Sequence, residues 1–198
     1  MYRRNRDAES SGSHIGLKGL PDAGVGFPRI RVQAMQTLRI NPSLSVADQV
    51  EERDVESLAA AGFKCLICNR PDSEGGTPSE RIRAACERHG IEFFLLPVVY
   101  SGLDVADGDA FGKILRQCEQ PALAYCRSGR RSAALWAIAA APLAGAQAVA
   151  QRAARIGIGL DELGPVLARS AARAGPPYAS NSDPGARERF SRLWVQER

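Results

Sequence analysis

The spacing of apolar and polar positions changes repeatedly from residue 37 onward. Short apolar runs bounded by turn residues predict strands at 37–40, 44–46, 64–68, 92–98 and 121–125. Between and after these runs, apolar residues recur at helical spacing over 51–61, 78–89, 105–118, 132–140, 145–156 and 161–173. Strands that alternate with helices are typical of an α/β fold, in which a mostly parallel sheet is flanked by helices in three layers.

The same pattern divides the chain into three parts. Residues 1–34 are rich in Gly, Ser and charge and show no period, so we expect a disordered leader, with Met35 as a candidate true start. Residues 35–173 form the predicted domain. Residues 174–198 are expected to be a linker followed by an amphipathic helix that begins near Asp183.

Composition narrows the class of protein. The chain of 198 residues has a net charge of +4, and no run approaches the roughly 20 apolar residues of a membrane span. Arginine is scattered along the chain, so neither nucleic acid nor a membrane is an expected partner. The basic N-terminus lacks the apolar segment of a secretory signal, which favours the cytoplasm. Five cysteines without framework spacing argue against a disulfide scaffold.

The segment 125–132 contains the strongest candidate for a nucleophile. Cys126 follows an apolar strand and is followed by a short loop and a helix. Backbone N–H groups in such a loop have no helical partner, and together with the helix dipole and Arg131 they stabilise a thiolate and bind an anion. We therefore predict an exposed Cys126 thiolate as the nucleophile, with Arg131 beside it. The rest of the expected anion-binding loop is Arg127, Ser128, Gly129, Arg130 and Ser132.

The predicted topology brings further residues to this loop. The carboxyl ends of parallel strands share one edge, so the loops after the third, fourth and fifth apolar strands should converge. Asn69 and Arg70 would then help to bind an anionic substrate or, alternatively, close a turn with a salt bridge. Asp72 would be a proton donor or a turn and cap residue, and Tyr100 is expected at the mouth of the pocket.

The remaining cysteines are predicted to be core residues. Cys65 and Cys68 are three apart on a strand, so they point to opposite faces and cannot easily bind one metal ion. Cys86 and Cys118 lie on apolar helix stripes. No metal or other cofactor is expected, and His89 is interpreted as a helix-end residue.

Taken together, the motifs resemble a known family. Tyr-Cys-Arg-Ser-Gly-x-Arg-Ser at 125–132 is similar to the active loop of rhodanese-type sulfurtransferases. The span 37–170 resembles the phosphatase-like domain of beta-lactamase hydrolase-like proteins, through Leu-Ser-Val-Ala-Asp-Gln at 44–49, Ala-Ala-Gly-Phe-Lys at 60–64 and Asn-Arg-Pro-Asp at 69–72. The resemblance implies a dual-specificity-phosphatase-like fold. That domain often occurs with sulfide- or persulfide-oxidising enzymes, so such an enzyme is a candidate partner.

Two features favour sulfur chemistry over phosphate chemistry. Four residues separate Cys126 from Arg131, where cysteine phosphatases resemble one another in having five, so the cradle is smaller. By the same resemblance the phosphatase acid would fall near Val99 or Tyr100, and neither is a carboxylate. Asp104, a few residues later, is typical of a helix cap. Sulfur transfer needs no such acid, because thiolates leave readily.

The leading hypothesis is therefore a sulfurtransferase that moves sulfane sulfur through a Cys126 persulfide, from a small anionic sulfur donor to a thiol acceptor. The alternative is a cysteine-dependent phosphatase that acts on aryl phosphates or phosphotyrosine through a phosphocysteine, with Asp72 as the acid. A third hypothesis is a non-catalytic persulfide-sensing or anion-binding module, in which Cys126 is modified without turnover.

Overall fold

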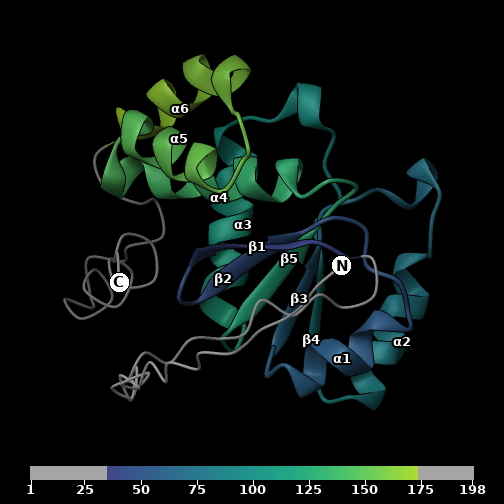
Figure 1. The fold of residues 1–198 in the computed structure, drawn as a ribbon. Coiled ribbons are helices and arrows are strands. Elements are labelled where there is room, and N and C mark those ends of the chain that lie inside the picture. Colours follow the sequence, from purple (N-terminus) through teal and green to yellow (C-terminus); the bar gives the residue numbers. More distant parts are fainter. Residues whose placement is uncertain (1–34, 174–198) are drawn as a thin grey trace, which may run out of the picture.

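The computed structural model describes residues 35–173, and a five-stranded sheet forms its centre (Figure 1). The strands stand in the order β1-β2-β5-β3-β4, with β1 antiparallel to β2 and all other neighbours parallel. Their bounds are Thr37–Asn41 (β1), Leu44–Ala47 (β2), Cys65–Cys68 (β3), Glu92–Leu95 (β4) and Ala122–Tyr125 (β5). The predicted α/β fold with a mostly parallel sheet is confirmed. The predicted helix near Asp183 lies outside the described residues.

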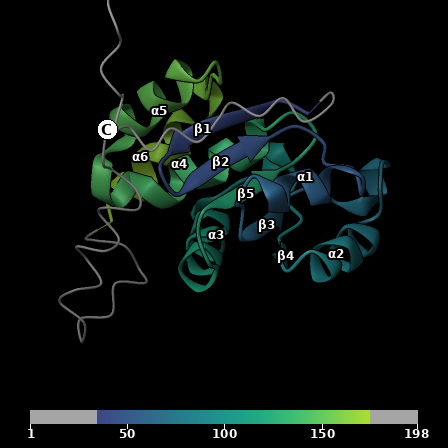
Figure 2. The same cartoon turned by 60° about the horizontal axis from the view of Figure 1, so that its bottom comes forward.

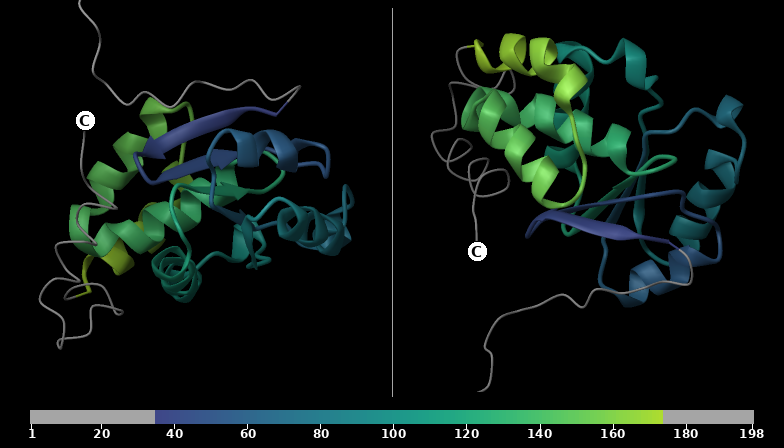
Figure 3. Two further views of the ribbon diagram at one scale, coloured as in Figure 1. Left: turned by 90° about the horizontal axis from the view of Figure 1, so that it is seen from below. Right: turned by 45° about the horizontal axis from the view of Figure 1, so that its top comes forward.

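Helices cover both faces of the sheet (Figures 2 and 3). Helices α1 and α2 pack on one face, and α3 to α6 pack on the other. Their bounds are Asp54–Ala60 (α1), Ser79–Arg88 (α2), Val105–Gln117 (α3), Arg130–Ala144 (α4), Ala146–Arg155 (α5) and Gly164–Ala171 (α6), with short 3-10 helices at Asp72–Glu74 (η1), Tyr100–Gly102 (η2) and Asp161–Leu163 (η3). Between residues 35 and 173, no helix is long and apolar enough to cross a membrane.

Alternation along β3 divides its residues between two apolar cores. Cys65 joins the core under α3 to α6, whereas Cys68 joins the core under α1 and α2. The prediction that these two cysteines point to opposite faces is confirmed. Cys86 and Cys118 are buried as predicted, and His89 follows the last residue of α2.

The register of the sheet aligns the carboxyl ends of β2, β5 and β3, so the chain segments that follow them begin side by side. The last residues of β2, β5 and β3 are paired, so the next residues, Asp48, Cys126 and Asn69, stand in that order across the edge. Backbone pairing continues one step further. The N–H of Cys126 donates to the Ala47 carbonyl at 3.4 Å, and the N–H of Asn69 donates to the Tyr125 carbonyl at 2.8 Å. The loops after β3 and β5 therefore lie side by side, as the parallel topology predicted.

The helix after the cysteine differs from its predicted extent. Helix α4 begins at Arg130 rather than at Ser132 and continues to Ala144. Arg130 and Arg131 therefore belong to the first turn of the helix, and the loop proper is only residues 126–129. The predicted bounds of α1 and β4 also extend beyond those observed.

Candidate active site

Cys126 lies at the carboxyl end of β5 and begins the loop 126–129, which we call the cysteine loop. The residue is only 2% exposed, so the prediction of an exposed sulfur is wrong. Its N–H still pairs with the Ala47 carbonyl, which keeps it between neighbouring strand ends. Cys126 nevertheless belongs to neither apolar core, and the next two residues, Arg127 and Ser128, are exposed. Its burial therefore arises at the sheet edge rather than in the packed interior.

Gly129 turns the cysteine loop into helix α4. Its φ of +78° is left-handed, a conformation that residues with a side chain rarely adopt. A Cβ at this position would also lie 3.4 Å from the carbonyl oxygen of Ala47. Because α4 starts at the next residue, its unpaired N–H groups and the positive end of its dipole lie at the loop. These groups are available as donors to an anion bound there.

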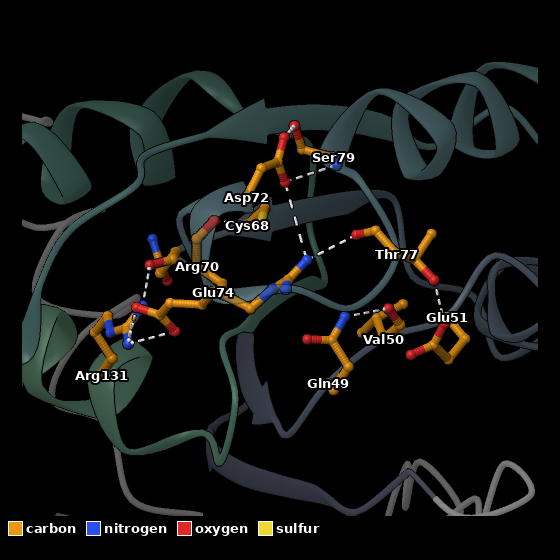
Figure 4. A network of polar contacts seen from close by, with 11 residues as sticks. Gln49, Val50, Glu51, Cys68, Arg70, Asp72, Glu74, Thr77, Ser79 and Arg131 are labelled. Carbon is orange, nitrogen blue, oxygen red and sulfur yellow. Dashed lines mark hydrogen bonds and ion pairs between the residues drawn. The ribbon is translucent and has the colours of Figure 1, made fainter.

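Arg131 reaches from the first turn of α4 to the end of β3. Its Nη1 donates to the carbonyl oxygen of Asn69 at 3.1 Å, and its Nη2 donates to both carboxylate oxygens of Glu74 at 2.8 and 3.0 Å (Figure 4). The Arg131 and Glu74 side chains are 11% and 27% exposed, so water screens this ion pair weakly. The Nε–H of Arg131 is buried and has no hydrogen-bond partner within residues 35–173. Glu74 is a site residue that sequence analysis missed.

Arg130 is also ion-paired rather than free. Its Nη2 donates to the Glu162 carboxylate at 2.5 Å, and its Nε donates to the Gly159 carbonyl at 3.2 Å. Its guanidinium lies 4.9 Å from the centre of the Tyr100 ring, a cation–π contact that places Tyr100 next to the first turn of α4. Burial raises the pKa of Tyr100. Of the three arginines near the loop, Arg127 alone has no ion-pair partner in the described part of the chain.

Asn69 connects the end of β3 to α4 and to the chain after β4. Its Oδ1 accepts the hydroxyl hydrogen of Ser132 at 2.8 Å, and its Nδ2 donates to the Leu96 carbonyl at 3.3 Å. Asn69 and Ser132 are both fully buried. Asn69 thus lies beside the cysteine loop as predicted. The single hydroxyl proton of Ser132 is used within the scaffold, so this side chain has no proton to offer a bound anion.

Arg70 and Asp72 shape the segment between β3 and α2. Arg70 is 2% exposed; its Nη2 donates to the Thr77 carbonyl at 2.7 Å and lies 3.9 Å from the Asp72 carboxylate (Figure 4). Asp72 accepts the N–H and the hydroxyl of Ser79 at 2.9 and 2.7 Å, and these bonds hold its pKa below the usual range. The structure therefore places both residues in the loop scaffold. An aspartate held in its ionised form is a poor proton donor, so Asp72 does not fit the role of an acid.

Asp48 lies on the other side of Cys126 from Asn69, and sequence analysis did not propose it as a site residue. Its backbone pairs with Ser128 of the cysteine loop, and its Oδ1 accepts the N–H of Gln36 at 2.9 Å. Burial raises the pKa of Asp48 above the usual range. Within residues 35–173, the other carboxyl groups with a shifted pKa all shift downward: Glu52, Asp72, Asp104 and Glu162. Burial thus favours the protonated form of Asp48, whereas the bond from Gln36 favours its carboxylate.

The mostly parallel sheet, with a cysteine, a short loop and a helix after its central strand, is similar to the fold of phosphatase-like α/β domains. Solved structures agree. A candidate phosphatase of Neisseria meningitidis is 31% identical to this chain, with a TM-score of 0.60, and the match covers 67% of this chain and 96% of that one. A candidate phosphatase of Shewanella putrefaciens (22% identity, TM-score 0.57, covering 70% and 93%) and Tk-PTP in its active form (17%, 0.56, covering 69% and 97%) share the fold.

The sequence places the chain within this class more narrowly. The chain belongs to the family of the phosphatase-like domain of beta-lactamase hydrolase-like proteins, whose family model matches residues 36–160. A beta-lactamase hydrolase-like protein of Agrobacterium fabrum is 33% identical over 106 residues, which are 52% of this chain and 25% of that protein. One of Xylella fastidiosa is 30% identical over 108 residues, with the same coverage. The match thus spans about a quarter of these curated relatives, and the predicted family resemblance is confirmed.

Proposed function

We propose that this domain is a cysteine-dependent phosphatase that acts on aryl phosphates or phosphotyrosine through a phosphocysteine at Cys126. The observation that carries the proposal is the position of Cys126. It lies at the carboxyl edge of the sheet, before the N-terminus of α4 and between the ends of β2 and β3, in a chain of a phosphatase-like family. The proposal reverses the order of the sequence-based hypotheses, in which sulfur transfer came first.

In the first step, the Cys126 thiolate attacks phosphorus. An S–P bond forms while the P–O bond to the leaving group breaks. The N–H groups of the cysteine loop and of the first turn of α4 stabilise the phosphoryl oxygens, and the unmet Nε–H of Arg131 is a further donor. Asp48 gives its proton to the departing oxygen, so that an alcohol or phenol leaves.

In the second step, water hydrolyses the phosphocysteine. The Asp48 carboxylate takes a proton from water as its oxygen attacks phosphorus, and the S–P bond breaks. Inorganic phosphate leaves, and both the thiolate of Cys126 and the protonated Asp48 are restored. A carboxyl group with a raised pKa suits both transfers, because it holds a proton nearer to neutral pH than an ordinary aspartate does.

Asp48 also supplies the acid whose apparent absence favoured sulfur transfer. That absence concerned the segment after β4, where Val99 and Tyr100 stand. The sheet order instead brings the backbone of Asp48, the residue after β2, beside the cysteine loop, while its carboxylate accepts the N–H of Gln36. The acid therefore comes from a strand far from the expected position in sequence.

Sulfur transfer through a Cys126 persulfide is the second candidate, and the four-residue spacing between Cys126 and Arg131 favours it. In that reaction the thiolate attacks the outer sulfur of a small anionic donor such as thiosulfate. An S–S bond forms, sulfite leaves with the electron pair, and a thiol acceptor then removes the sulfur. A persulfide- or sulfide-oxidising enzyme would be the partner.

One set of assays separates these functions. Purified protein is given p-nitrophenyl phosphate, or thiosulfate with cyanide, and each assay is repeated with Cys126→Ser and with Cys118→Ser, a buried cysteine outside the site. We expect phosphate ester turnover that Cys126→Ser abolishes and Cys118→Ser retains. Cys126-dependent turnover of thiosulfate alone would favour the second candidate. Full phosphatase activity in Cys126→Ser would contradict the phosphocysteine, and full thiosulfate turnover in the same variant would contradict the persulfide. No turnover of either substrate would favour the binding module.

A further inference from the structure

Asn69 and Glu74 together hold two of the three guanidinium nitrogens of Arg131. Nη1 is held by the Asn69 carbonyl, and Nη2 is held by both oxygens of Glu74. The third nitrogen, Nε, carries a buried hydrogen that no described residue accepts. An unmet buried donor is unfavourable unless a ligand satisfies it. The Nε–H of Arg131 is therefore a buried donor that is prepared for an acceptor.

Contacts of neighbouring residues hold the backbone of the segment that carries Glu74. The Arg70 guanidinium lies so close to Gly76 that a Cβ there would be 2.8 Å from Nη1 of Arg70. Asp72 anchors the segment to α2 through Ser79, and the N–H of Glu74 donates to the Pro71 carbonyl at 3.1 Å. The backbone position of Glu74 is thus supported by contacts within its own segment.

We propose that Glu74 is a positioning residue, which holds the Arg131 guanidinium so that its free Nε–H edge receives the anion bound at the cysteine loop. This inference rests on the proposed function only in that the loop binds an anion. An arginine that is held before binding loses less side-chain freedom when the anion arrives. Because Glu74 occupies Nη2 and leaves Nε unmet, it holds the arginine without taking all of its donors.

The test compares Glu74→Ala and the isosteric Glu74→Gln with Glu52→Gln. Glu52 is a matched control, because its carboxylate also pairs with arginines, at 2.8 Å to Arg81 and 2.9 Å to Arg88, outside the site. Sulfate, an unreactive oxyanion, is titrated by calorimetry at constant ionic strength, and kcat and KM are measured with p-nitrophenyl phosphate.

We expect Glu74→Ala to weaken sulfate binding about tenfold and to lower kcat/KM by a similar factor, because a misplaced donor acts on both. Glu74→Gln, which keeps one acceptor, should lose less, and Glu52→Gln should match the unsubstituted protein. Arg131→Ala should lower sulfate affinity at least as far. Glu74→Ala added to Arg131→Ala should then have no further effect, since Glu74 acts through the arginine.

Three results would overturn the proposal. Sulfate binding that is unchanged in Glu74→Ala would make the contact a structural ion pair, and tighter binding would make Glu74 a competitor of the anion. No sulfate binding by the unsubstituted protein would remove the anion site itself. Failure of the proposed function is distinguishable: a protein that hydrolyses no aryl phosphate, but whose sulfate affinity depends on Glu74, keeps the positioning role and loses the phosphatase.

Discussion

Two neighbouring segments at the same sheet edge, residues 69–78 after β3 and residues 126–129 after β5, use polar residues in opposite ways. Both follow a buried strand, carry an arginine and lead into a helix. In the first segment, Nη2 of Arg70 donates to the Thr77 carbonyl and Asp72 accepts from Ser79 of α2, although the Nε–H of Arg70 is buried without a partner within residues 35–173. The cysteine loop instead leaves Arg127 exposed and ends at the unpaired N–H groups of a helix.

A charged side chain that is close to the nucleophile in sequence is therefore not always available to bind a ligand. Arg130 and Arg131 are both adjacent to the cysteine loop, yet each is held by a carboxylate from elsewhere in the chain. An ion-paired guanidinium attracts a distant anion less, because its charge is largely compensated. An ion-paired guanidinium contributes to the site mainly by the fixed orientation of the N–H group that the ion pair leaves without a partner.

The largest change in activity is expected at Asp48, which pairs with the cysteine loop. Asp48→Asn should lower kcat for aryl phosphates about a hundredfold or more, because the leaving oxygen then departs without a proton. The donor must be protonated, so kcat should fall as pH rises through the raised pKa of Asp48, and this limb should disappear in the variant. A pH–rate profile and a series of leaving groups measure both effects.

Asp104→Asn is the control for this substitution, because Asp104 caps α3 and pairs with Arg169. We expect it to leave the profile unchanged. Equal rates for Asp48→Asn and the unsubstituted protein with a poor leaving group would remove Asp48 from the mechanism.

A smaller effect is expected in the segment after β3, where two adjacent glycines form a matched pair. Gly75 and Gly76 have φ values of +77° and +81°, so alanine at either costs about 1–2 kcal/mol in backbone strain. Only at Gly76 would the new Cβ also collide with Arg70, at 2.8 Å. Gly76→Ala should therefore lower the free energy of unfolding further than Gly75→Ala and reduce kcat/KM by displacing Glu74. Urea unfolding and steady-state kinetics of the pair test this; equal losses would contradict the scaffold role of Arg70.

The smallest effect is expected for Asp72→Ala, which removes the two bonds that Asp72 accepts from Ser79 at the start of α2. The loss should be about 1 kcal/mol of unfolding free energy near neutral pH, with activity within about twofold of the unsubstituted protein. The pKa of Asp72 is lowered from 3.8 by its bonds to Ser79, so its stabilisation is present above that value and is lost as pH falls through the lowered pKa. Urea unfolding at neutral and acid pH should show the two proteins converging. A large loss of activity would instead return Asp72 to the list of candidate acids.

The features that depend on local pattern could be predicted from the amino-acid sequence. The alternation of strand and helix periods predicted the α/β sheet, and the three-residue spacing of Cys65 and Cys68 predicted their opposite faces. The order of strand, cysteine, glycine and helix at 122–144 predicted a loop at a helix N-terminus. Each of these follows from residues within a few positions of one another, where backbone geometry is nearly fixed.

Which groups the site can use depends on contacts between segments that are distant in the sequence. Arg131 meets Asn69 and Glu74, which are 62 and 57 positions away, and Asp48 reaches the cysteine loop because β2 rather than β4 lies beside β5. The same strand neighbours bury Cys126, which the local pattern placed in the open. Hydrogen-bond partners, burial and proton affinity depend on surroundings that distant segments supply. The apolar periodicity of a single strand does not predict which strands will be its neighbours in the sheet.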